Sequence, residues 1–141
     1  MANHRITVLP GDGTGREVTL EALNLLKVVE QHSPLSFSIT EIPCGGQYYL
    51  ETGEEWPSGS FEHCRDESDA ILLGAIGWPG AVKPNGDLAG GQVILGLRSG
   101  LDLFANVRPI KLYNGIRHKI HGEYKQDWTP VHVDMQTLKH N

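Results

Sequence analysis

The feature that most constrains the fold is a short apolar strand followed at once by a glycine-rich turn and an amphipathic helix. The strand is predicted over residues 5–9, and it ends at Pro10 and the glycines 11, 13 and 15. A helix is predicted over residues 17–31, because apolar residues there recur on one helical face: Val18, Ala22, Leu25, Leu26 and Val29. A strand, a tight turn and a helix in this order are typical of α/β proteins.

The same alternation continues along the chain. Further strands are predicted over residues 36–42, 70–73 and 101–107, and further helices around residues 48–50, 58–65 and 92–99, with Ser58 as a helix cap. The run at residues 70–73 is apolar throughout, which is typical of a strand buried on both faces of a parallel sheet. We therefore predict an α/β fold with a parallel or mixed sheet flanked by helices. Ligands are expected beyond the carboxyl ends of the strands, and residues 74–91 form a long loop of the kind that carries function.

Composition narrows the class of protein. The 141 residues suffice for one domain, with 39% hydrophobic and 21% charged residues, as in ordinary globular proteins. A net charge of −5 without basic clusters argues against nucleic-acid binding, and no apolar run is long enough for a membrane span. The first residues do not resemble a signal peptide, so a cytoplasmic location is expected. The two cysteines, Cys44 and Cys64, are then expected to be buried thiols without a disulfide.

The glycine turn and one histidine pair are candidate ligand sites. Glycines at the start of a helix let an anion approach free backbone N–H groups, although the spacing is not the G-x-G-x-x-G fingerprint and a plain turn explains it equally well. His118 and His121, with Glu123 nearby, have metal-binding chemistry. They lack a third placed ligand, so a solvated loop is the favoured interpretation.

Two arginines, Arg98 and Arg108, lie ten positions apart around an apolar, strand-like run. Guanidinium groups are planar, permanently charged forks that bind carboxylates at two points. Two of them on fixed backbone would suit a small di- or tricarboxylic acid. Solvated or salt-bridged arginines are the ordinary alternative.

Four motifs in order resemble the isocitrate/isopropylmalate dehydrogenase family. They are the strand and turn of residues 6–15, the pair Gly45-Gly46, the run of residues 69–77, and the Arg98/Arg108 segment. The resemblance extends from about residue 5 to about residue 135. It implies an NAD- or NADP-dependent oxidoreductase that uses Mg²⁺ or Mn²⁺ to decarboxylate a 2-hydroxy diacid oxidatively, with 3-isopropylmalate, tartrate, malate or isocitrate as the substrate class.

The resemblance also implies roles for particular residues. Arg98 and Arg108 would bind substrate carboxylates, and Ile94 and Leu95 would form an apolar wall one turn before Arg98. The expected cofactor-binding residues are Thr14, Gly74, Ala75, Ile76 and Gly77. Isopropylmalate enzymes typically carry an acidic residue one further turn back, whereas this chain has Gly91 and Gln92, which leaves malate- or tartrate-like substrates open.

Residues 1–135 are interpreted as the N-terminal part of such an enzyme, and residues 136–141 as a tail that departs from the family pattern. In the family, the catalytic tyrosine and lysine and the metal-binding aspartates come later in the chain. The 141 residues alone are therefore expected to be catalytically inactive, and a homodimer is expected for full-length members. Two alternatives remain: a non-catalytic, regulatory-subunit-like α/β module that binds an anion, and an unrelated flavodoxin-like domain, which the arginine segment disfavours.

Overall fold

The computed structural model describes residues 2–116, 118–120, 123–125 and 134–140 of the chain. The chain forms two compact units, Met1–Leu101 and Asp102–Asn141. The first contains a parallel sheet of strand order β2-β1-β3, built from β1 (Ala2–Leu9), β2 (Leu35–Glu41) and β3 (Ala70–Leu73). Its helices are α1 (Thr14–His32), α2 (Gly46–Thr52), α3 (Ser60–Asp66) and α4 (Gly91–Gly100). The predicted α/β class, with a parallel sheet flanked by helices, is confirmed.

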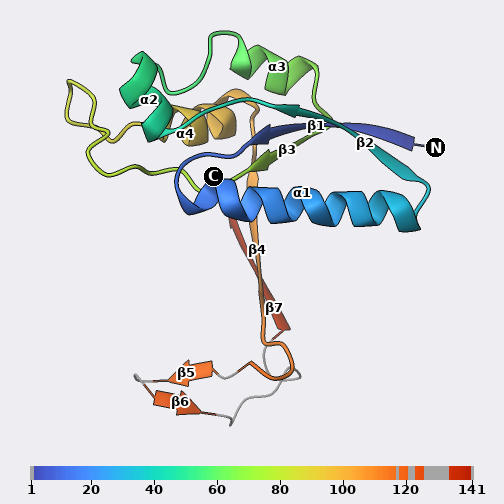
Figure 1. Ribbon diagram of the computed structural model, residues 1–141. Coiled ribbons are helices and arrows are strands. Elements are labelled where there is room, and N and C mark those ends of the chain that lie inside the picture. The colour runs from blue at the N-terminus through green and yellow to red at the C-terminus, as the bar shows by residue number, and fades with distance from the viewer. Residues whose placement is uncertain (1, 117, 121–122, 126–133, 141) are drawn as a thin grey trace. The chain divides into compact units, whose positions relative to one another are not determined.

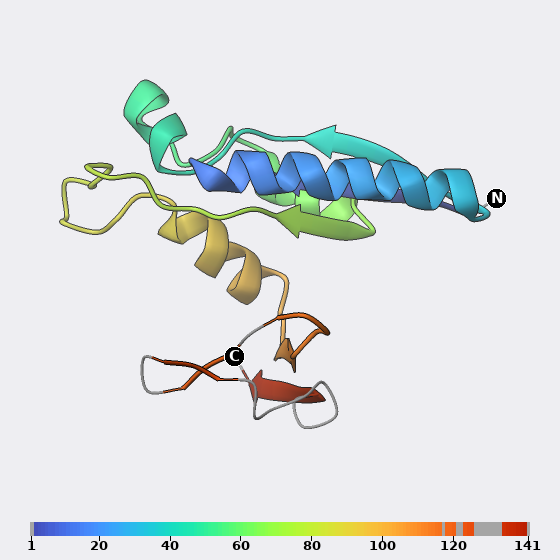
Figure 2. The same ribbon diagram turned by 60° about the horizontal axis from the view of Figure 1, so that its bottom comes forward.

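Helices cover both faces of this sheet. In Figures 1 and 2, α1 lies against one face, while α3 and α4 lie on the other. The main hydrophobic cluster joins the end of β1 to the second layer, and its buried members are Leu9, Cys44, Cys64, Val93 and Leu97. Because side chains alternate along a strand, the fully buried Val8 faces the side of α1. The central strand therefore anchors both layers.

Helix α1 does not bury the face that its hydrophobic spacing predicts. Its buried residues are Gly15 and Thr19. Val18 and Leu25, expected toward the core, are 58% and 63% exposed, whereas the predicted face residues Ala22, Leu26 and Val29 are half-buried. The small residues at positions 15 and 19 allow close approach to the turn after β1 and to Gly74, and this rotates the helix away from its most apolar stripe.

Three further local predictions need correction. β3 is not buried on both faces, because Ala70 and Leu73 are exposed, Leu73 by 38%, and the two residues between them are only half-buried. Gly59, in a left-handed conformation, precedes α3 in place of Ser58 and provides no side-chain cap. The strand predicted over residues 101–107 begins only at Ala105, since Leu101 still bonds to the last turn of α4 and Asp102 has a φ of 51°.

The second unit consists of antiparallel strand pairs. β4 (Ala105–Lys111) pairs with β7 (Asp134–His140), with Ala105 opposite His140 and Lys111 opposite Asp134. β5 (His118–Ile120) pairs with β6 (Glu123–Lys125). Large apolar side chains, including Phe104 and Tyr113, are exposed in this unit.

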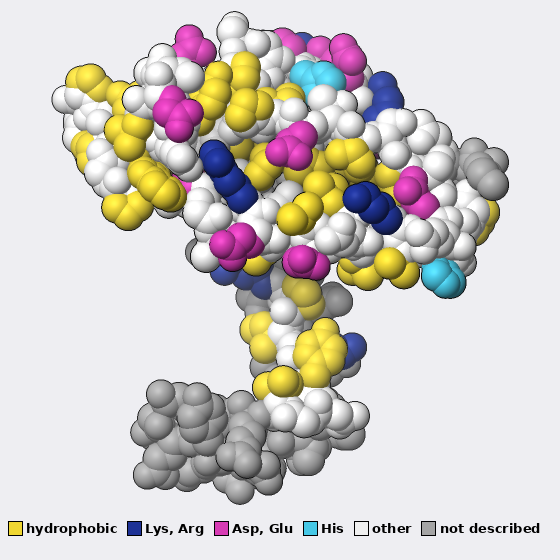
Figure 3. All heavy atoms as spheres, viewed as in Figure 1, with side chains coloured by type: hydrophobic (Ala, Val, Ile, Leu, Met, Phe, Trp, Pro, Cys, Tyr) yellow, Lys and Arg dark blue, Asp and Glu magenta, His cyan; other side chains and the backbone are white. Residues whose placement is uncertain are grey.

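The surface of the first unit carries hydrophobic, acidic and basic side chains side by side. Figure 3 shows exposed hydrophobic side chains lying between acidic and basic ones on one face. Within the described residues, no helix has the length and apolar character needed to cross a bilayer. Cys44 and Cys64 are buried and form no disulfide, as predicted.

An ion pair joins Arg5, in the middle of the central strand β1, to Asp69, the residue before β3. Asp69 accepts bonds from the Arg5 backbone N–H at 2.8 Å and from its guanidinium at 2.9 Å, while the Asp69 N–H donates to the Arg5 carbonyl. The side-chain hydrogen bond and the backbone N–H both favour the ionised carboxylate, so the pKa of Asp69 lies below its ordinary value of 3.8.

We expect Asp69→Asn to lower the melting temperature of the chain at pH 7. A depressed pKa contributes stability that is present above pH 3.8 and is lost as the pH falls through the lower folded-state value. The difference between wild type and variant should therefore shrink below pH 3.8. Thermal melts by circular dichroism at several pH values measure it, with Glu51→Gln, which changes an exposed carboxylate on α2, as the control; a gap that is constant down to pH 2 would contradict the assignment.

Candidate functional site

The glycine turn (residues 10–15) lies directly against the segment that follows β3 (residues 74–77, hereafter the 74–77 segment). The Asp12 N–H donates to the Ala75 carbonyl at 2.8 Å. A Cβ at Gly11, where φ is +74°, would lie 2.1 Å from the same oxygen, and a Cβ at Gly15 would lie 2.5 Å from it. Glycine is therefore required at both positions. Asp12 and Ala75 are 63 positions apart in the sequence, and the two regions that contain them, each expected to contact the cofactor, are brought into backbone contact.

The Asp12 carboxylate occupies the centre of this arrangement. The residue is only 3% exposed. One of its oxygens accepts the N–H groups of Gly46 at 2.8 Å and Gly77 at 2.9 Å, and the other accepts the N–H of Gln47 at 2.8 Å. A Cβ at Gly45 would lie 2.5 Å from the carboxylate, which explains the glycine there. Asp12 thus links the turn, the first residues of α2 and the 74–77 segment.

The outer side of the turn is open. Thr14 and Gly77 are exposed, and a Cβ at Gly77 would meet nothing within 4 Å. The start of α1 carries no side-chain cap. Beside it lies the indole of Trp78, which is 36% exposed and would come within 3.8 Å of a Cβ at Gly13. The N–H groups of Gly15 and Arg16 donate to the carbonyls of Asp12 and Gly13. This edge therefore offers a dinucleotide open glycine backbone, the exposed Thr14 and an aromatic ring on which a flat ring can stack.

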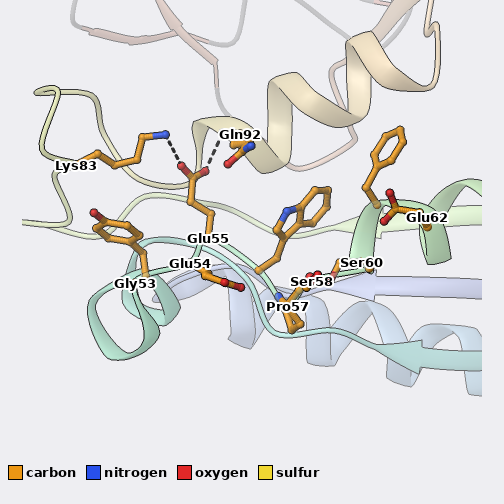
Figure 4. A pocket seen from close by; sticks show the side chains of 13 residues that line it. Gly53, Glu54, Glu55, Pro57, Ser58, Ser60, Glu62, Lys83 and Gln92 are labelled. Atoms are coloured by element: carbon orange, nitrogen blue, oxygen red, sulfur yellow. Dashed lines mark hydrogen bonds and ion pairs between the residues drawn. The ribbon is translucent and has the colours of Figure 1, made fainter.

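The N-terminal end of α4 abuts the same region. A Cβ at Gly90, the residue before α4, would lie 2.2 Å from Ile76. The 4% exposed Glu55 holds this end, because its carboxylate accepts the Gln92 N–H at 2.8 Å and the Lys83 ammonium at 2.7 Å. Figure 4 shows these contacts at one end of a cavity of about 380 Å³. The hydrogen bond from Lys83 to Glu55 raises the pKa of Lys83 above its ordinary value.

The expected substrate residues lie in both units. On α4, Arg98 is exposed, Leu95 is 62% exposed and Ile94 is half-buried. Ile94 and Arg98 are four positions apart and therefore lie on one face of the helix. Arg108 is exposed on β4, in the second unit. The expectation that the two guanidiniums grip one diacid stays a prediction.

Metal and thiol chemistry are not supported by the described residues. No group of three or more His, Cys, Asp or Glu side chains in the described ranges is arranged to hold a metal ion. Of the histidine pair considered above, His121 lies outside the described residues. Burial raises the pKa of the Cys44 thiol to about 11, so the thiol stays protonated and is a poor nucleophile at neutral pH.

Sequence patterns did not reveal Asp12, Glu55 or Trp78 as parts of the site. For Asp12 a clue existed, since a carboxylate between two glycines of a turn commonly accepts nearby backbone N–H groups. Glu55 gives no such clue, because its partners Lys83 and Gln92 are 28 and 37 positions away. Their pairing depends on the tertiary fold.

Known proteins match this chain over most of its length. The family model for isocitrate/isopropylmalate dehydrogenase matches residues 5–141. The 3-isopropylmalate dehydrogenase of Synechococcus sp. (strain CC9605) is 43% identical over 112 residues, covering 79% of this chain and 31% of the relative. That of Trichormus variabilis is 46% identical over 116 residues, covering 78% and 30%. The chain thus spans about 31% of the length of the curated relatives that it matches.

Solved structures give the same result. A β-decarboxylating dehydrogenase from Thermococcus kodakarensis, in its apo form, matches with a TM-score of 0.57 and 28% identity, over 96% of this chain and 41% of that one. Isocitrate dehydrogenase from Methylococcus capsulatus matches with a TM-score of 0.56 and 21% identity, over 95% and 42%, and this likeness concerns the fold alone. With its motifs in order, its matching fold and relatives above 40% identity, the chain belongs to the isocitrate/isopropylmalate dehydrogenase family.

Proposed function

We propose that the chain is the N-terminal part of an NAD(P)-dependent, metal-dependent β-decarboxylating dehydrogenase acting on a 2-hydroxy diacid, with 3-isopropylmalate as the first candidate. The observation that carries the proposal is the contact between the glycine turn and the 74–77 segment, with α4 beside them. Relatives named 3-isopropylmalate dehydrogenase favour that substrate within the class. The absence of an acidic residue at Gly91 and Gln92 keeps malate and tartrate as alternatives.

Each candidate residue then has a physical task. Arg98 and Arg108 neutralise and orient the carboxylates of the diacid by paired N–H···O bonds. Ile94 and Leu95 offer apolar surface to the substrate's alkyl group, and Leu95 has most of its side chain accessible for this. Thr14 and the backbone of the 74–77 segment bind the dinucleotide.

The cofactor and the metal differ in how far this chain can hold them. The open glycine edge beside Thr14 and Trp78 fits a dinucleotide, which supplies the hydride acceptor when bound. The described residues contain no group of side chains that fits a divalent metal, so no residue is assigned as a metal ligand. Homodimer formation and a cytoplasmic location belong to the proposal as expectations from the resemblance.

We expect the 141-residue chain to show no reduction of NAD⁺ or NADP⁺ above background with 3-isopropylmalate, malate, tartrate or isocitrate. The reason is that the described residues include no fitting metal set, while the resemblance places the acid, base and metal groups later in the family's chain. Absorbance at 340 nm with Mg²⁺ or Mn²⁺ present measures it. Turnover with any of these diacids would show that the 141 residues suffice for catalysis.

Binding tests the substrate assignment independently of turnover. We expect Arg98→Ala to weaken binding of 3-isopropylmalate about tenfold, since a charge-assisted bond to an accessible guanidinium is worth about 1.4 kcal/mol. Amide chemical shifts at residues 94–98 report the titration. Arg65→Ala, which removes an exposed arginine from α3, is the matched control and should leave binding unchanged. Equal affinity in wild type and Arg98→Ala would remove Arg98 from the site.

The non-catalytic module remains a second hypothesis, because it too would bind a diacid without turnover. Translating the coding region beyond Asn141 distinguishes the two. An arginine–tyrosine motif followed by spaced aspartates supports the enzyme, whereas a stop codon together with a stable monomer of this chain supports the module.

A further inference from the structure

The buried carboxylate of Asp12 has a role that the family resemblance does not assign. Its three hydrogen bonds all come from backbone N–H groups, two of them on α2 and one on Gly77. Within the described part of the chain, backbone alone donates to this carboxylate. The surrounding glycines leave it no further space, since a Cβ on Gly45 would strike the carboxylate itself. The geometry is that of a carboxylate placed to order backbone rather than to react.

The consequence is greatest for Gly77. Gly77 has a φ of 148°, and the space beside its Cα is open, since a Cβ there would meet nothing within 4 Å. Packing therefore does not hold the backbone at Gly77 in place. Its N–H bond to Asp12, at 2.9 Å, fixes the end of the 74–77 segment, while the Asp12 N–H to the Ala75 carbonyl, at 2.8 Å, fixes its middle. Gly77 also precedes Trp78, whose backbone packs on Gly46. One residue of the turn therefore determines the path of the segment by two bonds.

We propose that Asp12 is a positioning residue that holds the 74–77 segment against the glycine turn and thereby sets the affinity of this surface for a nicotinamide dinucleotide. The affinity part rests on the proposed function. Asp12 does not touch the ligand. A carboxylate bonded to N–H groups on both sides preorganises the loop, so that binding does not have to order it.

Two substitutions separate this role from a general effect on stability. Asp12→Ala removes all three acceptors. In Asp12→Asn, the amide oxygen can replace the carboxylate oxygen that accepts Gly46 and Gly77, while the amide NH₂ faces the Gln47 N–H, donor against donor. The alanine variant should thus release Gly77, and the asparagine variant should release Gln47 alone.

Amide hydrogen exchange by NMR on the full 141-residue chain tests this difference. In Asp12→Ala, we expect exchange at Gly77 to rise at least about tenfold more than at Val93 in the core of α4. In Asp12→Asn, Gln47 should exchange faster while Gly77 stays protected. Equal acceleration at all amides would reveal loss of global stability only, and protection of Gly77 in Asp12→Ala would overturn the proposal. If Asp12→Ala does not fold, the asparagine pattern decides alone.

Titration with NADH and with NADPH, followed at the amides of Thr14 and Gly77, tests the affinity part. We expect Asp12→Ala to bind at least about tenfold more weakly than wild type, Asp12→Asn to stay within about threefold, and the exposed control Asp66→Ala to be unchanged. Equal binding by wild type and Asp12→Ala would overturn the affinity part while leaving the proposed function intact. Absence of binding by wild type would contradict the proposed cofactor site, and the exchange pattern would still decide whether Asp12 orders the segment.

Discussion

Replacing Gly74 by alanine is expected to destabilise the chain by about 3 kcal/mol or more, which leaves much of it unfolded at 37 °C. A Cβ at this position would lie 2.0 Å from the Pro10 carbonyl oxygen and 2.7 Å from the hydroxyl of Thr19. Neither neighbour can move freely. Pro10 follows the central strand, and the Gly74 N–H donates to the Leu9 carbonyl at 2.8 Å as the sheet's last bond between β1 and β3.

A second glycine provides the matched control. Gly96 lies inside α4, and a Cβ there would meet nothing within 4 Å. We expect Gly96→Ala to stabilise the chain by about 1 kcal/mol, because alanine favours the helix and reduces the conformational entropy of the unfolded chain. Urea unfolding followed by circular dichroism measures both variants. A Gly74→Ala variant as stable as wild type would show that the contact between the turn and the 74–77 segment is not as close as described.

Hydrophobic patterning was sufficient to predict the helices and strands of the first unit, but not which of their faces are buried. The spacing around Ala22 and Leu26 correctly predicted a helix, because periodicity is a local property. It failed to predict the buried face, since Gly15 and Thr19 are selected by how closely α1 approaches the sheet rather than by hydrophobicity. Likewise, the apolar run of β3 predicted a strand correctly, but how far its two faces are buried depends on what packs against them.

The candidate site divides in the same way. The glycine turn and the 74–77 segment were recognisable from short motifs, because close backbone contact leaves glycine as the only residue that fits. The acidic side chains that hold these pieces together were not recognisable. A buried carboxylate such as Glu55 looks in the sequence like one of several glutamates near position 54, and only its partners distinguish it.

Glu55 is the clearest case of a buried charge that is satisfied on both sides. Its carboxylate receives the Lys83 ammonium on one oxygen and the Gln92 N–H, in the first turn of α4, on the other. Its backbone carbonyl also accepts the Gly45 N–H at 2.8 Å. A buried charge with this many partners fixes the start of the helix that carries Arg98, and loss of the carboxylate leaves both donors without their acceptor.

We therefore expect Glu55→Ala to lower the free energy of unfolding by about 3 kcal/mol, and Glu55→Gln by about half as much, because glutamine retains one acceptor oxygen but no charge. The exposed neighbour variant Glu54→Ala should stay within about 0.5 kcal/mol of wild type.

The contribution of the Glu55–Lys83 pair to stability depends on pH with a definite sign. The pKa of Lys83 is raised by Glu55, so the pair's contribution is complete below the ordinary value of 10.5 and is lost as the pH rises through the higher folded-state value. Urea unfolding of wild type and Glu55→Gln at pH 7 and above pH 10.5 should show the gap narrowing, whereas a gap independent of pH would mean that the ammonium contributes nothing to holding α4.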